Sequence, residues 1–343
     1  MLNPTLQDQV FELILNNYPR RADAVEDICQ LLNLAKDPVY RRLRGETYLP
    51  PSELSLLCRH YGISLDAIIH HESNNVICSF NAFTRRINDF SEYLNGFVEE
   101  FEQIHNLKDP HLHYASAELS VFTYNFFPEI ISFKLYIWGR TTWNLVSVRD
   151  RQFSLDLVTP PIIRLSQEVL NQYIRINSTE LWTAQIMDNT LAQIEYHVYS
   201  GGFRDPKEAL ILVDKLSEWS KHMKLMAAAG KKFNIGEKAE LGRGDFNLFY
   251  NEMVYTNITA LISAEEQQMV YSAFCTPNFL RSTDKRLCGY TNDWFNGIFS
   301  KSSRFSGEAE KLRDWYFREM DMKIARQRQR IERYIEENYS ELP

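Results

Sequence analysis

The chain has 343 residues, of which 24% are charged and 44% hydrophobic, a composition typical of a folded globular protein with two or three domains. Its formal net charge of -7 excludes a uniformly basic protein that coats nucleic acid, but it leaves room for a local basic patch. The five cysteines are scattered and never spaced as CxxC. We therefore expect reduced thiols, with neither a disulfide framework nor a zinc site.

No segment has the pattern of a targeting or membrane-spanning sequence. The N-terminus lacks a basic stretch followed by an apolar core. The most apolar window, residues 128–143, is interrupted by Glu129, Lys134 and Arg140. It falls short of the ~20 apolar residues that a bilayer requires. We therefore expect a cytoplasmic protein that makes no membrane contact.

Residues 5–70 predict five short helices in close succession. Their expected ranges are 6–16, 22–32, 36–44, 51–61 and a last segment over 62–69. Between the second and third helices, Asn33 is expected to adopt the left-handed conformation that glycine usually supplies. Asp37 and Pro38 have the character of an N-cap and a first helical residue, so a later start of the third helix stays open.

Particular residues in these helices follow a known order. They are Ile28, Leu32, Asn33, Val39, Tyr40, Arg41, Arg44, Gly45, Leu57, Tyr61, Gly62, Ile63, Ser64, Leu65 and Asp66. This order resembles the XRE-type helix-turn-helix domain of the Cro and phage-repressor class, over about a fifth of the chain. The resemblance implies a helical bundle whose third helix enters the major groove, and a dimer that binds palindromic DNA.

The third predicted helix is basic within an acidic protein. Residues 36–44 carry four basic side chains and one acidic side chain. Val39 and Leu43, four residues apart, are expected to face inward, which leaves one face free for DNA. The side chains expected to contact DNA from that face are Lys36, Tyr40, Arg41 and Arg44. Those expected to touch the DNA backbone from the following loop are Thr47 and Tyr48.

A second interpretation of the same pattern is a basic but merely solvated helix face. Residues 1–72 hold seven basic and ten acidic side chains, so the domain as a whole is not basic. The alternative function is then a protein-interaction or scaffold module that uses a helix-turn-helix-like domain without binding DNA.

The rest of the chain is predicted to be mostly helical. A boundary is expected between residues 72 and 82, near His70 and His71, where the helical pattern breaks. The predicted helices cover 84–105, 161–176, 178–199, 205–229 and 306–338. Stretches 254–259 and 269–274 are rich in β-branched and aromatic residues, and they predict a small β element near 246–281, for which a hairpin is one arrangement. The expected fold class is mainly α: a helix-turn-helix bundle over 1–72, then a mostly helical regulatory and dimerisation region over 82–343.

Sequence motifs for catalysis are absent, so we expect no enzyme, no cofactor and no metal. His111 and His113 would share one face of a strand, as metal ligands do, but a surface turn is the favoured interpretation. A weaker pattern precedes the last helix, where hydroxyl and basic groups adjoin a helix N-terminus. Its residues, a candidate site for a phosphate-bearing effector, are Lys301, Ser302, Ser303 and Arg304. The alternative there is that Ser306 is only an N-cap and the basic side chains are solvated.

These patterns together predict a sequence-specific transcriptional regulator. Its expected partners are double-stranded DNA, a second copy of the chain and a small-molecule effector. The layout also resembles long bacterial regulators whose large C-terminal region has no assigned chemistry. The apolar seam of the last helix, around Ile324 and Ile331, is compatible with packing in its own domain, with a dimer contact, or with a basic helix near DNA.

Overall fold

The computed structural model describes residues 4–18, 20–69, 74–84, 86–252, 256–265 and 267–339. The chain divides into two compact units, Met1–Ile77 and Cys78–Pro343. This division falls inside the interval in which the sequence analysis placed the boundary, although His70 and His71 themselves lie outside the described residues. No helix within the described ranges is both long and apolar enough to cross a bilayer.

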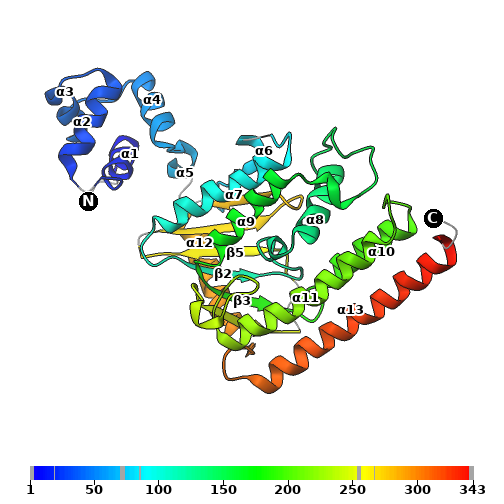
Figure 1. The fold of residues 1–343 in the computed structure, drawn as a ribbon. Helices are drawn as coiled ribbons and strands as arrows, with labels where there is room; N and C mark the ends of the chain where they lie inside the picture. Colours follow the sequence, from blue (N-terminus) through cyan, green and yellow to red (C-terminus); the bar gives the residue numbers. More distant parts are fainter. Residues whose placement is uncertain are drawn as a thin grey trace. The chain divides into compact units, whose positions relative to one another are not determined.

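The first unit is a bundle of short helices (Figure 1). Their bounds are α1 (Leu6–Leu15), α2 (Arg21–Leu32), α3 (Lys36–Leu43), α4 (Pro51–Tyr61) and α5 (Leu65–Ile69). The five helices predicted for this region are confirmed, with ends shifted by a few residues at most. Thr5 and Asp8 form a capping box that fixes the start of α1. The small core of the unit contains Val10, Phe11, Ile14, Val25, Ile28, Val39, Leu57 and Cys58.

The turn between α2 and α3 has the predicted conformation. Asn33 ends α2 with φ 52° and ψ 47°, in the left-handed region. α3 begins at Lys36, so the later start capped by Asp37 is not what the structure shows. Pro38 occupies the third position of the helix. A backbone N–H at this position has no partner inside the helix, so a proline, which lacks the N–H, costs little stability there.

The second unit contains the remaining elements. In chain order they are β1 (Ser79–Phe80), α6 (Asn81–Thr84), α7 (Phe90–His105), β2 (His111–Ala115), η1 (Thr123–Phe126), α8 (Pro128–Thr141), η2 (Leu155–Leu157), α9 (Pro160–Tyr173), β3 (Asn177–Trp182), α10 (Asp188–Tyr199), α11 (Glu208–Ala229), η3 (Ala239–Leu241), β4 (Phe246–Tyr250), β5 (Thr259–Ser263), β6 (Gln268–Ala273), β7 (Phe279–Ser282), α12 (Lys285–Phe299), β8 (Ser303–Arg304) and α13 (Glu310–Tyr339).

The second region is rich in helix, as expected, but the expectation of only a small β element is wrong. Its described residues form a mixed sheet of eight strands in the order β1-β7-β6-β5-β2-β3-β4-β8. β2, β3 and β4 run parallel, and the other neighbouring pairs are antiparallel. The predicted hairpin is present as β5 and β6, with its first strand later in the chain than expected. Val254 and Tyr255, where that strand was expected to begin, lie outside the described residues.

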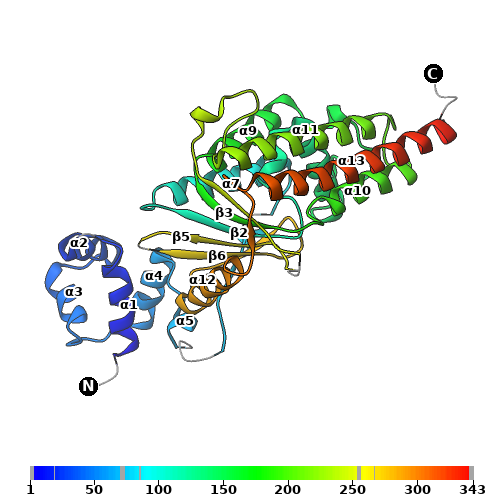
Figure 2. The ribbon, with the colours of Figure 1, turned by 90° about the horizontal axis from the view of Figure 1, so that it is seen from below.

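Helices cover both faces of this sheet. Figure 2 shows α12 on one face and α7, α9 and α11 on the other. Beneath α12, the buried side chains of Leu181, Leu261 and Phe295 form a separate small core. The opposite face carries the main core, which includes residues from β2, β3 and β5 and from helices α7 to α11 and α13. The unit is therefore a three-layer α/β structure.

Two helix predictions are corrected by this arrangement. Residues 178–199, expected to be one helix, form β3 followed by α10. β3 was misassigned because it has only two apolar residues, Leu181 and Trp182, and these directly precede a strong helical pattern. The helix expected from Asp205 begins at Glu208, with Asp205 accepting a hydrogen bond from the Lys207 N–H at 2.9 Å. Its predicted end before Gly230 is confirmed.

The last helix, α13, packs within its own unit. Its apolar seam belongs to the main core, including Tyr316, Ile324 and Ile331. Its basic residues pair with carboxylates of α10 and α11: Lys323 Nζ lies 2.7 Å from Asp188, Arg328 Nε 2.8 Å from Asp214, and Arg330 Nη2 2.7 Å from Glu195. Among the three roles left open by the sequence, packing inside the chain accounts for this seam and for these charges.

His111 and His113 lie in a central strand, so the interpretation as a surface turn is wrong. Their rings share one face of β2, 4.7 Å apart, and they contact Thr179 and Ser263 rather than carboxylates. No group of three or more metal-binding side chains occurs in the part of the chain that the structure describes.

Candidate nucleic-acid interface

The first unit presents one face of α3 to solvent. Val39 is fully buried in the core of the first unit, and Leu43, four residues later, packs against the same core. Because side chains four apart lie on the same side of a helix, these two residues fix which face of α3 points outward. The predicted inward anchors are therefore where the sequence analysis placed them.

Most of the predicted contact residues lie on the outward face or in the loop after it. Lys36, Arg41 and Arg44 are exposed, and Tyr48 in the loop is 81% exposed. Tyr40 and Thr47 differ from the other four, because both are half-buried, and the Tyr40 ring packs against the core. Their side chains are less available to a partner than those of the other four predicted residues.

A single carboxylate lies beside the two exposed arginines. Glu46 accepts hydrogen bonds from Arg44, with Nε to Oε1 at 2.5 Å, and its Oε2 lies 3.8 Å from Arg41 Nε. The hydrogen bond from Arg44 holds the pKa of Glu46 below its ordinary value. Lys36 has a looser neighbour, Glu26, at 3.9 Å. Both arginines are thus held near one another, and the charge that they present is partly offset.

The fourth basic residue of this run, Arg42, points the other way. It forms a bidentate pair with Glu53 of α4, with N–O distances of 2.7 and 2.9 Å. Its third contact is the carbonyl oxygen of Pro38, and its side chain is only 13% exposed. A bidentate arginine–carboxylate pair fixes geometry as well as charge, so Arg42 ties α3 to α4 and is not part of the exposed basic face.

Sequence analysis missed the residue that holds the loop after α3. Gln7 of α1 is 91% buried, and its Nε2 donates to the carbonyl oxygens of Arg42 and Thr47 at 2.8 and 3.0 Å. Its Oε1 accepts from the N–H of Leu49 at 2.7 Å. One amide therefore satisfies three backbone groups on either side of Tyr48. The polar position in the apolar stripe of α1 was the only signal of this role in the sequence.

A second polar cluster closes the same bundle. The carboxylate of Asp27 accepts from the hydroxyls of Tyr18 and Tyr61 at 2.5 and 2.6 Å. These hydrogen bonds lower the pKa of Asp27, and His60 lies 3.6 Å from the same oxygen. Asp27 therefore connects α2 to α4 and to the segment after α1.

The four residues predicted to bind an anion do not converge. Lys301 and Ser303 line an open cleft of about 640 Å³ together with Asn251, Glu252 and Trp294. The Ser302 hydroxyl donates to the Ile298 carbonyl at 2.7 Å and accepts from Asn251 at 3.0 Å.

Arg304 and the start of the last helix also differ from what the anion site requires. Arg304 donates to Asn247 Oδ1 and Ser306 Oγ at 2.6 and 3.2 Å. Ser306 does not cap a helix, because α13 begins only at Glu310. The expected helix N-terminus is thus not at these residues, and Glu252 in the cleft opposes an anion.

Comparison with known proteins adds no assignment: no protein-family model, no curated protein and no solved structure matches this chain at a significant level.

Proposed function

We propose that this protein is a sequence-specific transcriptional regulator that binds double-stranded DNA through the exposed face of α3. The observation that carries the proposal is that one basic side chain of this segment is largely buried in an ion pair, whereas the others are exposed to solvent. Arg42 is used internally, whereas the side chains of Lys36, Arg41 and Arg44 remain exposed while Val39 is buried. Guanidinium groups on one exposed helix face are the donors that the major groove of DNA requires.

The anchoring of α3 supports the same function. Base recognition needs side chains held in fixed positions, because a contact that must first be ordered gains less free energy. The pair between Arg42 and Glu53 and the three hydrogen bonds of Gln7 fix both ends of the α3–loop segment. Tyr48, at the exposed tip between two held residues, is placed to touch a phosphate or a sugar.

In the proposed mode of binding, the protein acts as a dimer on two half-sites of the DNA. Dimers of this class place two reading helices about one helical turn of DNA apart. Because the net charge of the chain is negative, nonspecific attraction to DNA is weak, and affinity depends on the small basic face and on pairing of two copies. Light scattering across the working concentration range measures whether the chain is a dimer.

The test begins with selection of binding sequences from a pool of random duplexes, followed by anisotropy titrations at several salt concentrations. We expect the selected site to be palindromic, with a salt slope of about -0.9 for each phosphate neutralised. Arg41→Ala and Arg44→Ala should each lower specific affinity roughly 10- to 100-fold if the arginine pairs with a guanine. Arg59→Ala is the matched control, since Arg59 is an exposed arginine of α4 in the same unit.

Two results would contradict the proposal. Specific binding that survives the Arg41→Ala, Arg44→Ala double variant would move the interface away from α3. Absence of salt-dependent DNA affinity in the folded protein would favour the alternative, a protein-interaction module built on the same bundle.

A further inference from the structure

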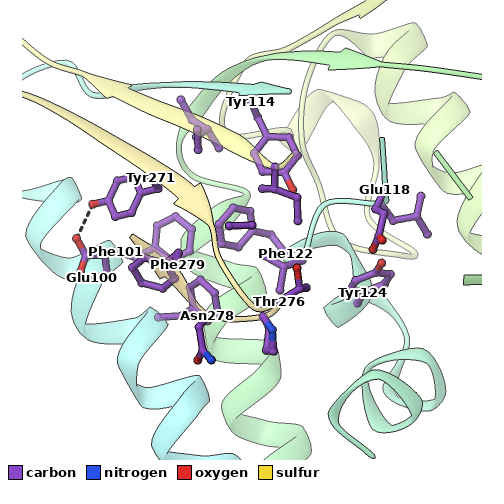
Figure 3. Close-up of a pocket in the computed structure, with 18 of the residues that line it drawn as sticks. Glu100, Phe101, Tyr114, Glu118, Phe122, Tyr124, Tyr271, Thr276, Asn278 and Phe279 are labelled. Atoms are coloured by element: carbon purple, nitrogen blue, oxygen red, sulfur yellow. Dashed lines mark hydrogen bonds between the residues drawn. The ribbon is translucent and has the colours of Figure 1, made fainter. Parts of the chain in front are cut away.

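A cavity lies in the second unit, between helix α7 and the face of the sheet formed by β2, β5 and β6 (Figure 3). η1, with the segment before it, and the loop over residues 276–279 close it. Its volume is about 100 Å³. An apolar cavity of about 150 Å³ takes up benzene, so a space of this order has the dimensions of a single-ring molecule.

The walls of the cavity are mainly aromatic. Phe122 lies 5.1 Å from Phe101 and 5.5 Å from Phe97, measured between ring centroids. Phe279 lies 5.6 Å from Tyr271, and the two rings meet at a steep angle. Ring edges and faces at these spacings favour an aromatic guest over a flexible chain, because they offer edge-to-face contacts.

Two carboxylates border this aromatic space, and they differ in how fully they are compensated. Glu100 accepts a hydrogen bond from the Tyr271 hydroxyl at 2.5 Å and lies 3.2 Å from Arg281 Nε. Glu118 accepts from the Asn189 amide. No ion pair to Glu118 occurs among the described residues. Glu118 thus lacks a direct ion pair, although its charge also favours the protonated form of the buried Lys134 and so opposes the lowering of the pKa of that lysine.

A buried hydroxyl also points into the cavity. Tyr114 of β2 is 2% exposed. The Ser116 and Ser120 side chains lie close enough to interact with its hydroxyl, but neither forms a hydrogen bond of regular geometry with it. Figure 3 shows this hydroxyl directed toward the space between Phe122 and Glu118. A buried hydroxyl without a regular hydrogen bond is costly, so a bound molecule that supplies one would gain free energy there.

The electrostatic environment selects the charge of that molecule. The residues that line the cavity include two carboxylates and no lysine, arginine or histidine. The buried Lys134 does not line it: its Nζ donates to Gln193 at 2.7 Å and lies 4.7 Å from the centre of the Tyr124 ring. The two carboxylates would therefore repel an anionic group, whereas they would attract a cation.

We infer that this cavity is a binding site for a small aromatic amine. One ring occupies the space between Phe101, Phe122 and Phe279. The protonated amine donates to the carboxylate of Glu118 and to the hydroxyl oxygen of Tyr114. Glu118 thus supplies the charge, and the phenylalanine rings supply the shape. The inference concerns the second unit alone and does not depend on DNA binding.

The experiment compares two probes of nearly equal size and opposite charge on the full-length protein. Calorimetric titration should show saturable binding of one 2-phenylethylamine per chain, and binding of phenylacetate at least about tenfold weaker, since a charge-assisted hydrogen bond is made with the amine only. Trp138 lines the cavity, so its fluorescence provides a second signal.

Three variants locate the site. Glu118→Gln should lower the affinity for 2-phenylethylamine roughly tenfold and remove most of the preference over phenylacetate. Glu102→Gln removes the same charge from an exposed position of α7 outside the cavity and should change neither affinity. Ala273→Leu adds bulk to a half-buried lining position and should abolish binding of both probes, with the melting temperature reporting whether the variant is folded.

Equal affinity for the two probes, or no saturable binding of either, would overturn the inference. So would an unchanged preference in Glu118→Gln, a comparison that decides the matter even if Ala273→Leu fails to fold.

Discussion

Glu46 determines how much positive charge the exposed face of α3 presents. It is the common neighbour of Arg41 and Arg44, and all three side chains are about half exposed. Exposed ion pairs contribute little to folding, so this carboxylate matters more for what the arginines can bind. A DNA phosphate approaching the two guanidinium groups must displace it or be repelled by it. Under the proposed function, Glu46 therefore lowers the affinity of α3 for DNA.

Replacing the Glu46 carboxylate provides a test in which the substitution is expected to strengthen DNA binding. We expect Glu46→Gln to increase DNA affinity several-fold, because two guanidinium groups lose a competing partner. Anisotropy titrations with one duplex at fixed salt measure the change. Glu12→Gln removes an exposed charge from α1 of the same unit and controls for net charge. An equal gain in both variants would mean that only the overall charge matters.

At the scale of elements, the turn between α2 and α3 sets the orientation of the proposed reading helix. Three residues connect the two helices, and Asn33 turns the chain by adopting positive φ. A left-handed conformation is accessible to asparagine and glycine but is sterically unfavourable for β-branched residues. The geometry of the helix-turn-helix thus depends on one side chain that contributes nothing to the core.

Substitution at the turn separates backbone strain from loss of contacts. Asn33→Val should destabilise the first unit by about 1–2 kcal/mol, whereas Asn33→Gly should be close to neutral. Hydrogen exchange of peptides from residues 5–69 in the full-length protein measures the opening free energy of this unit. If Asn33→Val and the wild-type protein showed similar protection from hydrogen exchange, the turn would tolerate another conformation.

At the scale of the whole molecule, the second unit buries many ionisable groups in their neutral form. Burial lowers the pKa of five histidines, and it lowers that of His113 to about 4. These histidines are His105, His111, His113, His197 and His222. Burial also lowers the pKa of Lys134 to about 8 and that of Lys232 to about 7, although Glu118 and Glu180 respectively oppose the shift.

These shifts predict the direction of the stability profile. Below pH 6.5 the unfolded chain binds protons at histidines that remain neutral when folded, so the free energy of unfolding should fall as pH decreases from about 6.5 toward 4. The two lysines extend the same trend upward, with stability rising between about pH 7 and 10. Urea unfolding followed by tryptophan fluorescence measures the second unit alone, because all six tryptophans lie in it. A flat profile between pH 7 and 5 would contradict this prediction.

The sequence predicted what depends on neighbours along the chain. The five helices of the first unit, the left-handed Asn33 and the inward Val39 all follow from local spacing and from the conformational preferences of single residues. The same local rules failed for β2 and β3. The alternation of histidine and apolar residues in β2 is too short to distinguish a strand from a turn, and β3 begins with four polar residues although most of it is buried.

Only the tertiary structure decided which residues remain available for binding. Arg41 and Arg42 are adjacent in sequence and chemically identical, yet only Arg42 meets Glu53, which belongs to another helix. Glu118 and Phe279 line one cavity although more than half of the second unit separates them in the chain. Side-chain identity thus determined the available chemistry, whereas contacts between distant segments decided where that chemistry is exposed, because burial and pairing are set by packing across elements.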